Sequence, residues 1–230
     1  MGFKKYLPLL LLGIGVLVLI LVFVFIKNFS KEKGVVDEEV AIEIAFKDRP
    51  VASLTPSEDG HWLNLKVDKI KVAKSSSLDY ELLYTLPDGR TQGVPGTVDL
   101  KGKTSFERKL LLGSESSGKF RYDEGVKEGS LTVRIRDSKG KLLAKFSTKW
   151  HLQSNETDLT SVDGNFKYTL TGKPKGMFFV TMETFGLPSY EETDLPASVE
   201  SGPYGVFSSS ELPAGEAPGW QITSGNIFYK

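Results

Sequence analysis

The strongest constraint on this chain of 230 residues is an apolar segment near its N-terminus, residues 6–26, which contains no charged side chain. An α-helix rises about 1.5 Å per residue, so this segment is long enough to cross a hydrocarbon core of about 30 Å. It has no polar face at a helical period, which excludes the amphipathic helix of a soluble protein. The segment is therefore predicted to be a transmembrane helix that contacts the lipid bilayer.

Lysines flank this segment on both sides and bear on its processing and orientation. Lys4 and Lys5 precede it, and no small-x-small cleavage site follows it, so we expect a retained signal anchor. Clustered positive charge favours the cytoplasmic side of a membrane. We therefore expect residues 1–5 to form a short cytoplasmic tail and the C-terminal domain to lie outside the cytoplasm, at the cell membrane. Because lysines also follow the segment, the opposite orientation stays open.

Beyond a charged stalk, residues 27–39, apolar and polar side chains alternate in a series of short segments. This period of two predicts β-strands that bury one face. A slip in the pattern predicts a bulge near Asp68 and Lys69, and the sequence PDGR at residues 87–90 predicts a tight turn. The predicted strands are residues 40–46, 63–72, 78–86, 91–100, 106–112, 131–135 and 142–150.

About seven strands without a convincing helix predict an all-β ectodomain, with an immunoglobulin- or fibronectin-like sandwich over residues 40–152. Residues 91–100 contain a proline, which suits an edge strand. The chain has no cysteine, so the disulfide of antibody domains is absent and only the architecture carries over. The same absence excludes thiolate metal sites and cysteine nucleophiles.

Residues 153–230 are predicted to form a small β-unit with a proline- and glycine-rich excursion. Residues 166–170 alternate, and residues 177–185 are apolar on both faces. Residues 186–219 contain five prolines and five glycines, a composition typical of irregular chain, yet the aromatic residues within and after this segment need burial. Whether the unit packs on the sandwich or supplies its last strands stays open.

Residues 113–120, GSESSGKF, nearly match the sequence motif of a phosphate-binding loop. Phe120 stands where that motif needs Ser or Thr for magnesium, and no helix start follows, so we reject this interpretation. Residues 113–128 are instead predicted to be a long loop, and long loops in compact domains often bind ligands. The candidate ligand or partner contacts are Lys119, Phe120, Arg121, Tyr122 and Asp123. The alternative is that the two aromatic residues hold this loop against the end of the sandwich.

The chain has two histidines, His61 and His151, each beside a tryptophan. They could meet across a sheet and bind a metal together with acids, but we favour surface histidines at strand ends. The number of histidines does not exclude a Ser–His–acid triad, although the sequence has no nucleophile-elbow motif to identify the serine. No catalytic residue, metal site or cofactor is therefore predicted.

Charge is balanced over the whole chain but not along it. Residues 1–36 hold five lysines and one glutamate, and residues 190–230 hold six acids against one lysine. Between them the two signs alternate along the predicted strands. No stripe of one sign is present for nucleic acid to bind, so we expect no nucleic-acid partner.

An N-terminal anchor followed by a cysteine-free β-domain resembles single-pass bacterial envelope proteins with a β-sandwich ectodomain. Residues 80–82 (YEL), 87–89 (PDG) and 180–183 (VTME) are also similar to the outer domain of transmembrane anti-sigma factors. That resemblance implies a membrane-anchored regulator. The chain departs from that family at residues 1–5, which are too short for a cytoplasmic sigma-binding domain.

These features predict a membrane-anchored extracytoplasmic protein that binds an unknown protein or envelope polymer, or takes part in envelope assembly, and is not an enzyme. The alternative is an envelope hydrolase on a β-sandwich scaffold. A pocket that brings His61 or His151 within hydrogen-bonding reach of a serine and an acid would favour the hydrolase. A flat surface with an exposed aromatic loop would favour binding.

Overall fold

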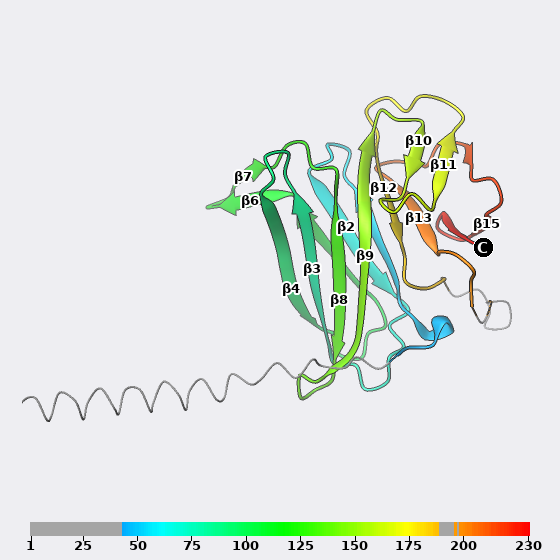
Figure 1. Cartoon of the computed structure of the whole chain (residues 1–230). Helices are drawn as coiled ribbons and strands as arrows, with labels where there is room; N and C mark the ends of the chain where they lie inside the picture. Colours follow the sequence, from blue (N-terminus) through cyan, green and yellow to red (C-terminus); the bar gives the residue numbers. More distant parts are fainter. Residues whose placement is uncertain (1–42, 189–195, 197) are drawn as a thin grey trace, which may run out of the picture. The chain divides into compact units, whose positions relative to one another are not determined.

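The computed structural model describes residues 43–188, 196 and 198–230, which belong to one compact unit, Ala41–Lys230. These residues form antiparallel β-sheets and one short 3-10 helix, η1 (Phe46–Asp48) (Figure 1). The prediction of an all-β fold is therefore confirmed for this part of the chain. Within it, no helix has the length and apolar character needed to cross a membrane, and residues 6–26 lie outside it.

The largest sheet has eight strands in the order β15-β16-β13-β12-β9-β8-β3-β4. Its edge strand β4 contains Pro95, which is tolerated there because an edge strand needs fewer N–H donors, as predicted. Residues after position 153 supply four of the eight strands, so they continue the sheet that the earlier residues begin. The strands are β3 (Ser77–Thr85), β4 (Thr91–Asp99), β8 (Glu128–Arg136), β9 (Leu142–Ser154), β12 (Phe178–Glu183), β13 (Tyr204–Ser208), β15 (Gln221–Thr223) and β16 (Ile227–Tyr229).

A three-stranded sheet, β1-β2-β5, faces one side of the long sheet across a shared core. Its strands are β1 (Val51–Pro56), β2 (Trp62–Asp68) and β5 (Phe106–Leu111). Leu54, Leu63 and Leu65 of this sheet and Leu82 and Val133 of the long sheet are fully buried in that core. Alternate residues of β2 and β3 are buried, which is the period of two expected for strands with one face on a core.

A second small sheet, β10-β11-β14, contributes to a separate core. Its strands are β10 (Asp158–Thr160), β11 (Lys167–Leu170) and β14 (Gly215–Glu216). Strand β12 serves both cores, because Phe179 belongs to the second core while Val180 and Met182 belong to the first. Residues 177–185, which are apolar on both faces in the sequence, include β12, and consecutive residues of β12 are buried on both of its faces.

Two local predictions near the start of the described chain are wrong. The strand predicted at residues 40–46 lies partly outside the described residues, and its described end forms no strand. There the Asp48 N–H donates to the Ala45 carbonyl at 2.9 Å, which closes the turn of η1. The phase slip marks the end of β2 and not a bulge, because β2 pairs with β1 and β5 in an unbroken register and ends at Asp68, after which Lys69 adopts a positive φ of 56°.

The turn predicted at residues 87–90 is confirmed. The Gly89 N–H donates to the Leu86 carbonyl and the Leu86 N–H donates to the Arg90 carbonyl, both at 2.8 Å. Gly89 has a φ of 85°, a conformation in which a side chain is strained.

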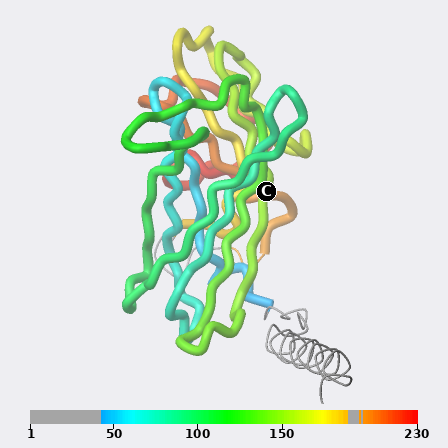
Figure 2. Tube along the Cα trace, turned by 90° about the vertical axis from the view of Figure 1, so that its left-hand side faces the viewer, coloured from blue at the N-terminus to red at the C-terminus, as the bar shows by residue number. Residues whose placement is uncertain are grey.

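Residues 113–128, predicted to be one long loop, contain a β-hairpin instead. Strands β6 (Gly113–Ser116) and β7 (Lys119–Tyr122) pair as a two-stranded sheet that projects from the rest of the fold (Figures 1 and 2). Ser117 and Gly118 both have positive φ, the conformation of a two-residue hairpin turn. The prediction failed because β6 has no large apolar residue and β7 is only four residues long, so the alternation along β7 is too short to indicate a strand.

Candidate binding site: an aromatic cluster between two pockets

The turn between β1 and β2 positions the first two side chains of the site. The Ser57 hydroxyl donates to Asp59 Oδ1 at 2.5 Å and accepts from the Trp62 N–H at 3.0 Å. Asp59 Oδ1 also accepts from the His61 N–H at 3.1 Å, and Gly60 supplies the positive φ of 73° that the turn requires. His61 and Trp62 are therefore held at one end of the three-stranded sheet.

These hydrogen bonds give Ser57, Asp59 and His61 a structural role. The pKa of Asp59 lies below its usual value because the Ser57 hydroxyl, and then the His61 N–H, donate to its carboxylate. The Ser57 proton thus points to Asp59, whereas a nucleophilic serine gives its proton to a histidine ring. The trio forms a turn and not a catalytic triad.

The β6–β7 hairpin places two aromatic rings against this turn. Tyr122 stacks on His61 with ring centroids 4.2 Å apart, and Phe120 meets Trp62 edge to face at 5.5 Å. Phe120 and Tyr122 are nearly parallel, with centroids 6.3 Å apart. We call these four residues the aromatic cluster. Phe120 remains 46% exposed and Tyr122 37% exposed, so the rings attach the hairpin to β2 and still face solvent.

The other candidate contacts take different positions. Lys119 and Arg121 are exposed and alternate with the aromatic residues along β7, so they lie on its other face. Asp123 accepts a hydrogen bond from the Tyr84 hydroxyl at 2.9 Å, which ties the base of the hairpin to β3. Burial, together with this carboxylate, raises the pKa of Tyr84. The structure therefore joins Phe120 to Trp62, the first residue of β2, and Tyr122 to His61 in the turn before it, although these residues are far apart in sequence.

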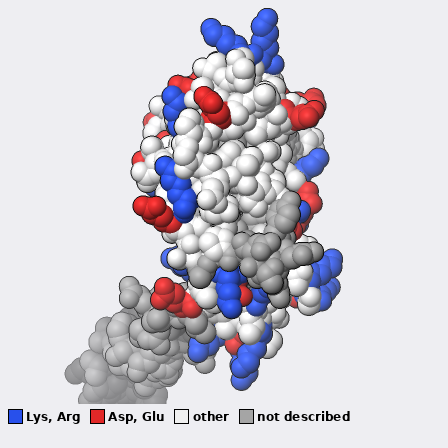
Figure 3. Space-filling model, turned by 90° about the vertical axis from the view of Figure 1, so that its right-hand side faces the viewer, with Lys and Arg blue, Asp and Glu red and all other residues white. Residues whose placement is uncertain are grey.

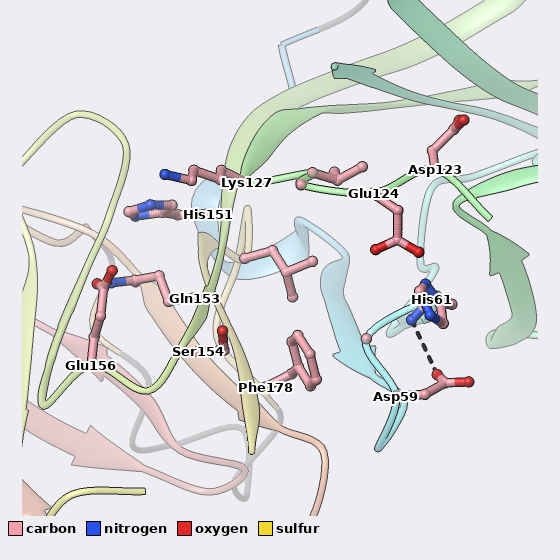
Figure 4. Close-up of a pocket in the computed structure, with 14 residues that line it drawn as sticks. Asp59, His61, Asp123, Glu124, Lys127, His151, Gln153, Ser154, Glu156 and Phe178 are labelled. Carbon is pink, nitrogen blue, oxygen red and sulfur yellow. Dashed lines mark hydrogen bonds between the residues drawn. The ribbon is translucent and has the colours of Figure 1, made fainter. Parts of the chain in front are cut away.

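A pocket of about 430 Å³ adjoins the cluster through Asp59, Gly60 and His61. Figure 4 shows the Glu124 carboxylate pointing into the space between His61 and Phe178. Asp59 and Glu124 are both exposed to solvent. This pocket therefore presents carboxylate oxygens beside an aromatic surface.

Both histidines line this pocket, and their rings have different surroundings. His151 Nδ1 lies 2.8 Å from the Thr160 carbonyl oxygen, so Nδ1 carries the proton. Within the described chain, neither ring hydrogen-bonds to a serine hydroxyl, and no three His, Asp or Glu side chains gather to hold a metal ion. On the same wall, Gln153 donates to Glu156 at 3.0 Å and accepts from the Thr160 N–H at 2.9 Å.

A second pocket, of about 350 Å³, adjoins the same turn through Ser57 and Trp62. Pro56, Asn64 and Lys109 complete much of its wall. The first pocket therefore meets the cluster at His61, and the second pocket meets it at Trp62.

A second turn repeats the hydrogen bonds of the first. The Ser161 hydroxyl donates to Asp163 Oδ1 at 2.5 Å and accepts from the Phe166 N–H at 3.0 Å, and the Asn165 N–H donates to Asp163 Oδ1 at 3.1 Å. The two sequences, SEDGHW and SVDGNF, share the pattern S-x-D-G-x-aromatic. This repeat is the sequence signal that predicts both turns, and with them the placement of His61 and Trp62.

A third pocket, of about 360 Å³, lies beside this second turn and holds Asp163, Glu183, Tyr204 and Lys149. Burial, and then the charge of Asp163, raises the pKa of Glu183. Burial also acts to raise the pKa of Asp163, but hydrogen bonds from Ser161, Tyr204 and Asn165 outweigh it and lower that pKa. The two carboxyl groups are therefore shifted in opposite directions.

Charged side chains of both signs are interspersed on the face shown in Figure 3, and much of its centre is uncharged. On strands β3 and β8, Arg134 pairs with Glu81 at 3.2 Å and Arg136 pairs with Asp79 at 2.7 Å. These cross-strand pairs place opposite charges beside each other on β3 and β8.

Comparison with known proteins assigns no family: no family model matches the chain, and no curated protein matches it. Function is therefore inferred from the residues of the chain itself.

Proposed function

We propose that this protein is a membrane-anchored, extracytoplasmic binding protein, or a component of envelope assembly, whose contact surface is the aromatic cluster. The observation that carries this proposal is the exposure of Phe120 and Tyr122 on a hairpin that His61 and Trp62 hold in place. Large aromatic side chains held rigidly at a surface are the residues that most often anchor a partner.

The position of the cluster supports this role. In our proposal the two facing sheets form an immunoglobulin- or fibronectin-like sandwich, a fold in which binding elements gather at the ends of the sheets. The cluster lies at one end of β1, and η1 lies at the other end, about 20 Å away at the usual rise of a strand. The cluster is therefore remote from the end of β1 at which η1 lies.

Photocrosslinking in intact cells tests the proposal. A photoreactive amino acid at position 120 is expected to form a specific adduct with a protein or an envelope polymer. The same amino acid at position 222 is the matched control, because Ile222 is also an exposed apolar residue, 64% exposed, but lies on β15. Equal adducts from both positions, or none from position 120, would contradict the proposal.

Protease treatment of intact cells tests the location. The protease is expected to cleave the domain that follows residue 26 when it can reach only the outer face of the cell membrane. Protection of this domain, while other outer-surface proteins are cleaved, would reverse the proposed orientation.

An envelope hydrolase is the second candidate, and the third pocket is the observation that favours it. A carboxyl group with a raised pKa beside one with a lowered pKa is typical of an acid–base pair. However, Asp163 already accepts hydrogen bonds from Ser161, Tyr204 and Asn165, which leaves it a poor base. Release of soluble fragments from envelope polymer, lost in Glu183→Gln, would favour the hydrolase over the binding protein.

A further inference from the structure

We infer that the aromatic cluster and the two pockets beside it bind a linear, uncharged polysaccharide. The chain would run from the pocket at Asp59 and Glu124, across Tyr122 and Phe120, to the pocket at Trp62. This inference rests on the proposed binding function and gives that function a ligand class.

The shape of the surface favours an extended ligand. Both pockets adjoin the turn between β1 and β2, one through His61 and the other through Trp62. The rings of Tyr122 and Phe120 contact these same two residues, so the cluster connects the pockets. A compact ligand fits one pocket, whereas a linear polymer can contact both pockets and the rings between them.

The rings call for flat units with C–H groups on their faces. Phe120 and Tyr122 lie within 7° of parallel, with centroids 6.3 Å apart. The face of an aromatic ring carries partial negative charge, which attracts the weakly positive C–H groups on the face of a sugar ring. His61 covers one face of Tyr122, so in our proposal the exposed parts of the two nearly parallel rings contact successive units of such a polymer.

The first pocket calls for hydrogen-bond donors. Asp59 and Glu124 are exposed carboxylates, and carboxylates only accept hydrogen bonds. Sugar hydroxyls supply such donors without carrying charge. A polyanion would be repelled by the four carboxylates that line the first pocket, Asp59, Asp123, Glu124 and Glu156, which outnumber its single lysine, Lys127. A polycation would be repelled by Lys109, the one charged residue that lines the second pocket. The mixed charges therefore favour an uncharged chain.

Binding measurements on the full chain in a mild detergent test this inference. The probes are cellohexaose and chitohexaose as uncharged chains, polygalacturonate as a polyanion and hexalysine as a polycation. We expect saturable binding of an uncharged hexasaccharide by calorimetry, with a change in tryptophan emission because Trp62 lines the site. Phe120→Ala and Tyr122→Ala should each weaken binding about tenfold, whereas Ile222→Ala should leave it unchanged.

The melting temperature of each variant checks that the fold is retained, which we expect because Phe120 and Tyr122 are exposed. The inference is overturned if neither hexasaccharide binds, if the two ring variants bind as the unaltered chain does, or if a charged polymer is preferred. If the saccharides fail while position 120 still forms its specific adduct in cells, the ligand class is wrong and the binding function stands. If both experiments fail, both are wrong.

Discussion

The two S-x-D-G-x-aromatic turns have the same hydrogen bonds from and to their Ser and Asp side chains, but their aromatic residues differ in burial. In the first turn the aromatic residue is Trp62, which is half-buried and meets the exposed ring of Phe120. In the second turn it is Phe166, which is 1% exposed and packs against Tyr204, Trp220 and Phe228. The aromatic residue of the first turn therefore lies at the surface, whereas that of the second turn lies in a hydrophobic core.

The difference shows that the local sequence determines the turn and that the neighbouring strands determine its use. Asp163 of the second turn accepts a further hydrogen bond, from the Tyr204 hydroxyl at 2.5 Å. Asp59 of the first turn lines the pocket beside the aromatic cluster. Both carboxylates line a pocket, but in the second turn the carboxylate also binds Tyr204 of β13, whereas in the first turn it lies beside the aromatic cluster.

The largest expected effect comes from truncating the two aromatic residues. Phe166→Ala should lower the free energy of unfolding by about 3–5 kcal/mol, because it leaves a cavity in a closed core. Trp62→Ala should lower it by only about 1–2 kcal/mol, because Trp62 is half-buried. Urea unfolding followed by circular dichroism measures both values. Equal losses would mean that Trp62 and Phe166 contribute equally to stability, which would contradict the difference in their burial.

The glycines of the two turns give a closer test. Gly60 and Gly164 have φ of 73° and 72°, so alanine at either position adds about 1–2 kcal/mol of backbone strain. A Cβ at Gly60 would also lie 2.5 Å from Phe178 Cε1, whereas none of the surrounding atoms lies within 4 Å of a Cβ at Gly164. Gly60→Ala should therefore destabilise by about 1–3 kcal/mol more than Gly164→Ala, measured by urea unfolding. The reverse order would contradict the packing of Phe178 on the first turn.

Tyr204→Phe tests the additional hydrogen bond of the second turn. Its loss should lower the free energy of unfolding by about 1–2 kcal/mol at neutral pH. The pKa of Asp163 is lowered in the folded state, so the stability from its contacts is present above the unfolded pKa and is lost as pH falls through the folded pKa. The difference in melting temperature between Tyr204→Phe and the unaltered chain should therefore shrink at acidic pH. A difference that does not change with pH would mean that the hydroxyl acts by packing alone.

Phe120→Ala is expected to have the smallest effect on stability. The ring is exposed and contributes mainly its edge contact with Trp62, so the loss should be below about 1 kcal/mol by urea unfolding. A loss above about 2 kcal/mol would show that the first turn also depends on its aromatic partner for folding.

Alternation of polar and apolar residues predicted the strands that have one face on a core. It succeeded for β3, β8 and β9. The buried faces of β12 correspond instead to the continuous apolar run of residues 177–185. It did not predict β1, a short strand that begins after Pro50, or the β6–β7 hairpin, whose two faces are exposed. Alternation of polar and apolar residues indicates burial of one face only, so strands that are buried or exposed on both faces are not recognised from it.

The candidate site was predicted in part. Phe120 and Tyr122 were candidates because they lie in a segment predicted to be a long loop, but their contact with His61 and Trp62 depends on the pairing of β2 with β5, which brings the hairpin to the turn. The pocket likewise combines β9 with the turn before β2. Contacts between residues this far apart follow from the strand order of the sheets, which local patterns do not specify.

Strand β12 has a consequence for how the molecule unfolds. Phe179 packs in one core while Val180 and Met182 pack in the other, so the strand cannot leave one core without leaving both. The two cores are therefore expected to melt as one cooperative transition, and the amide hydrogens of β12 are expected to exchange only when the whole domain opens.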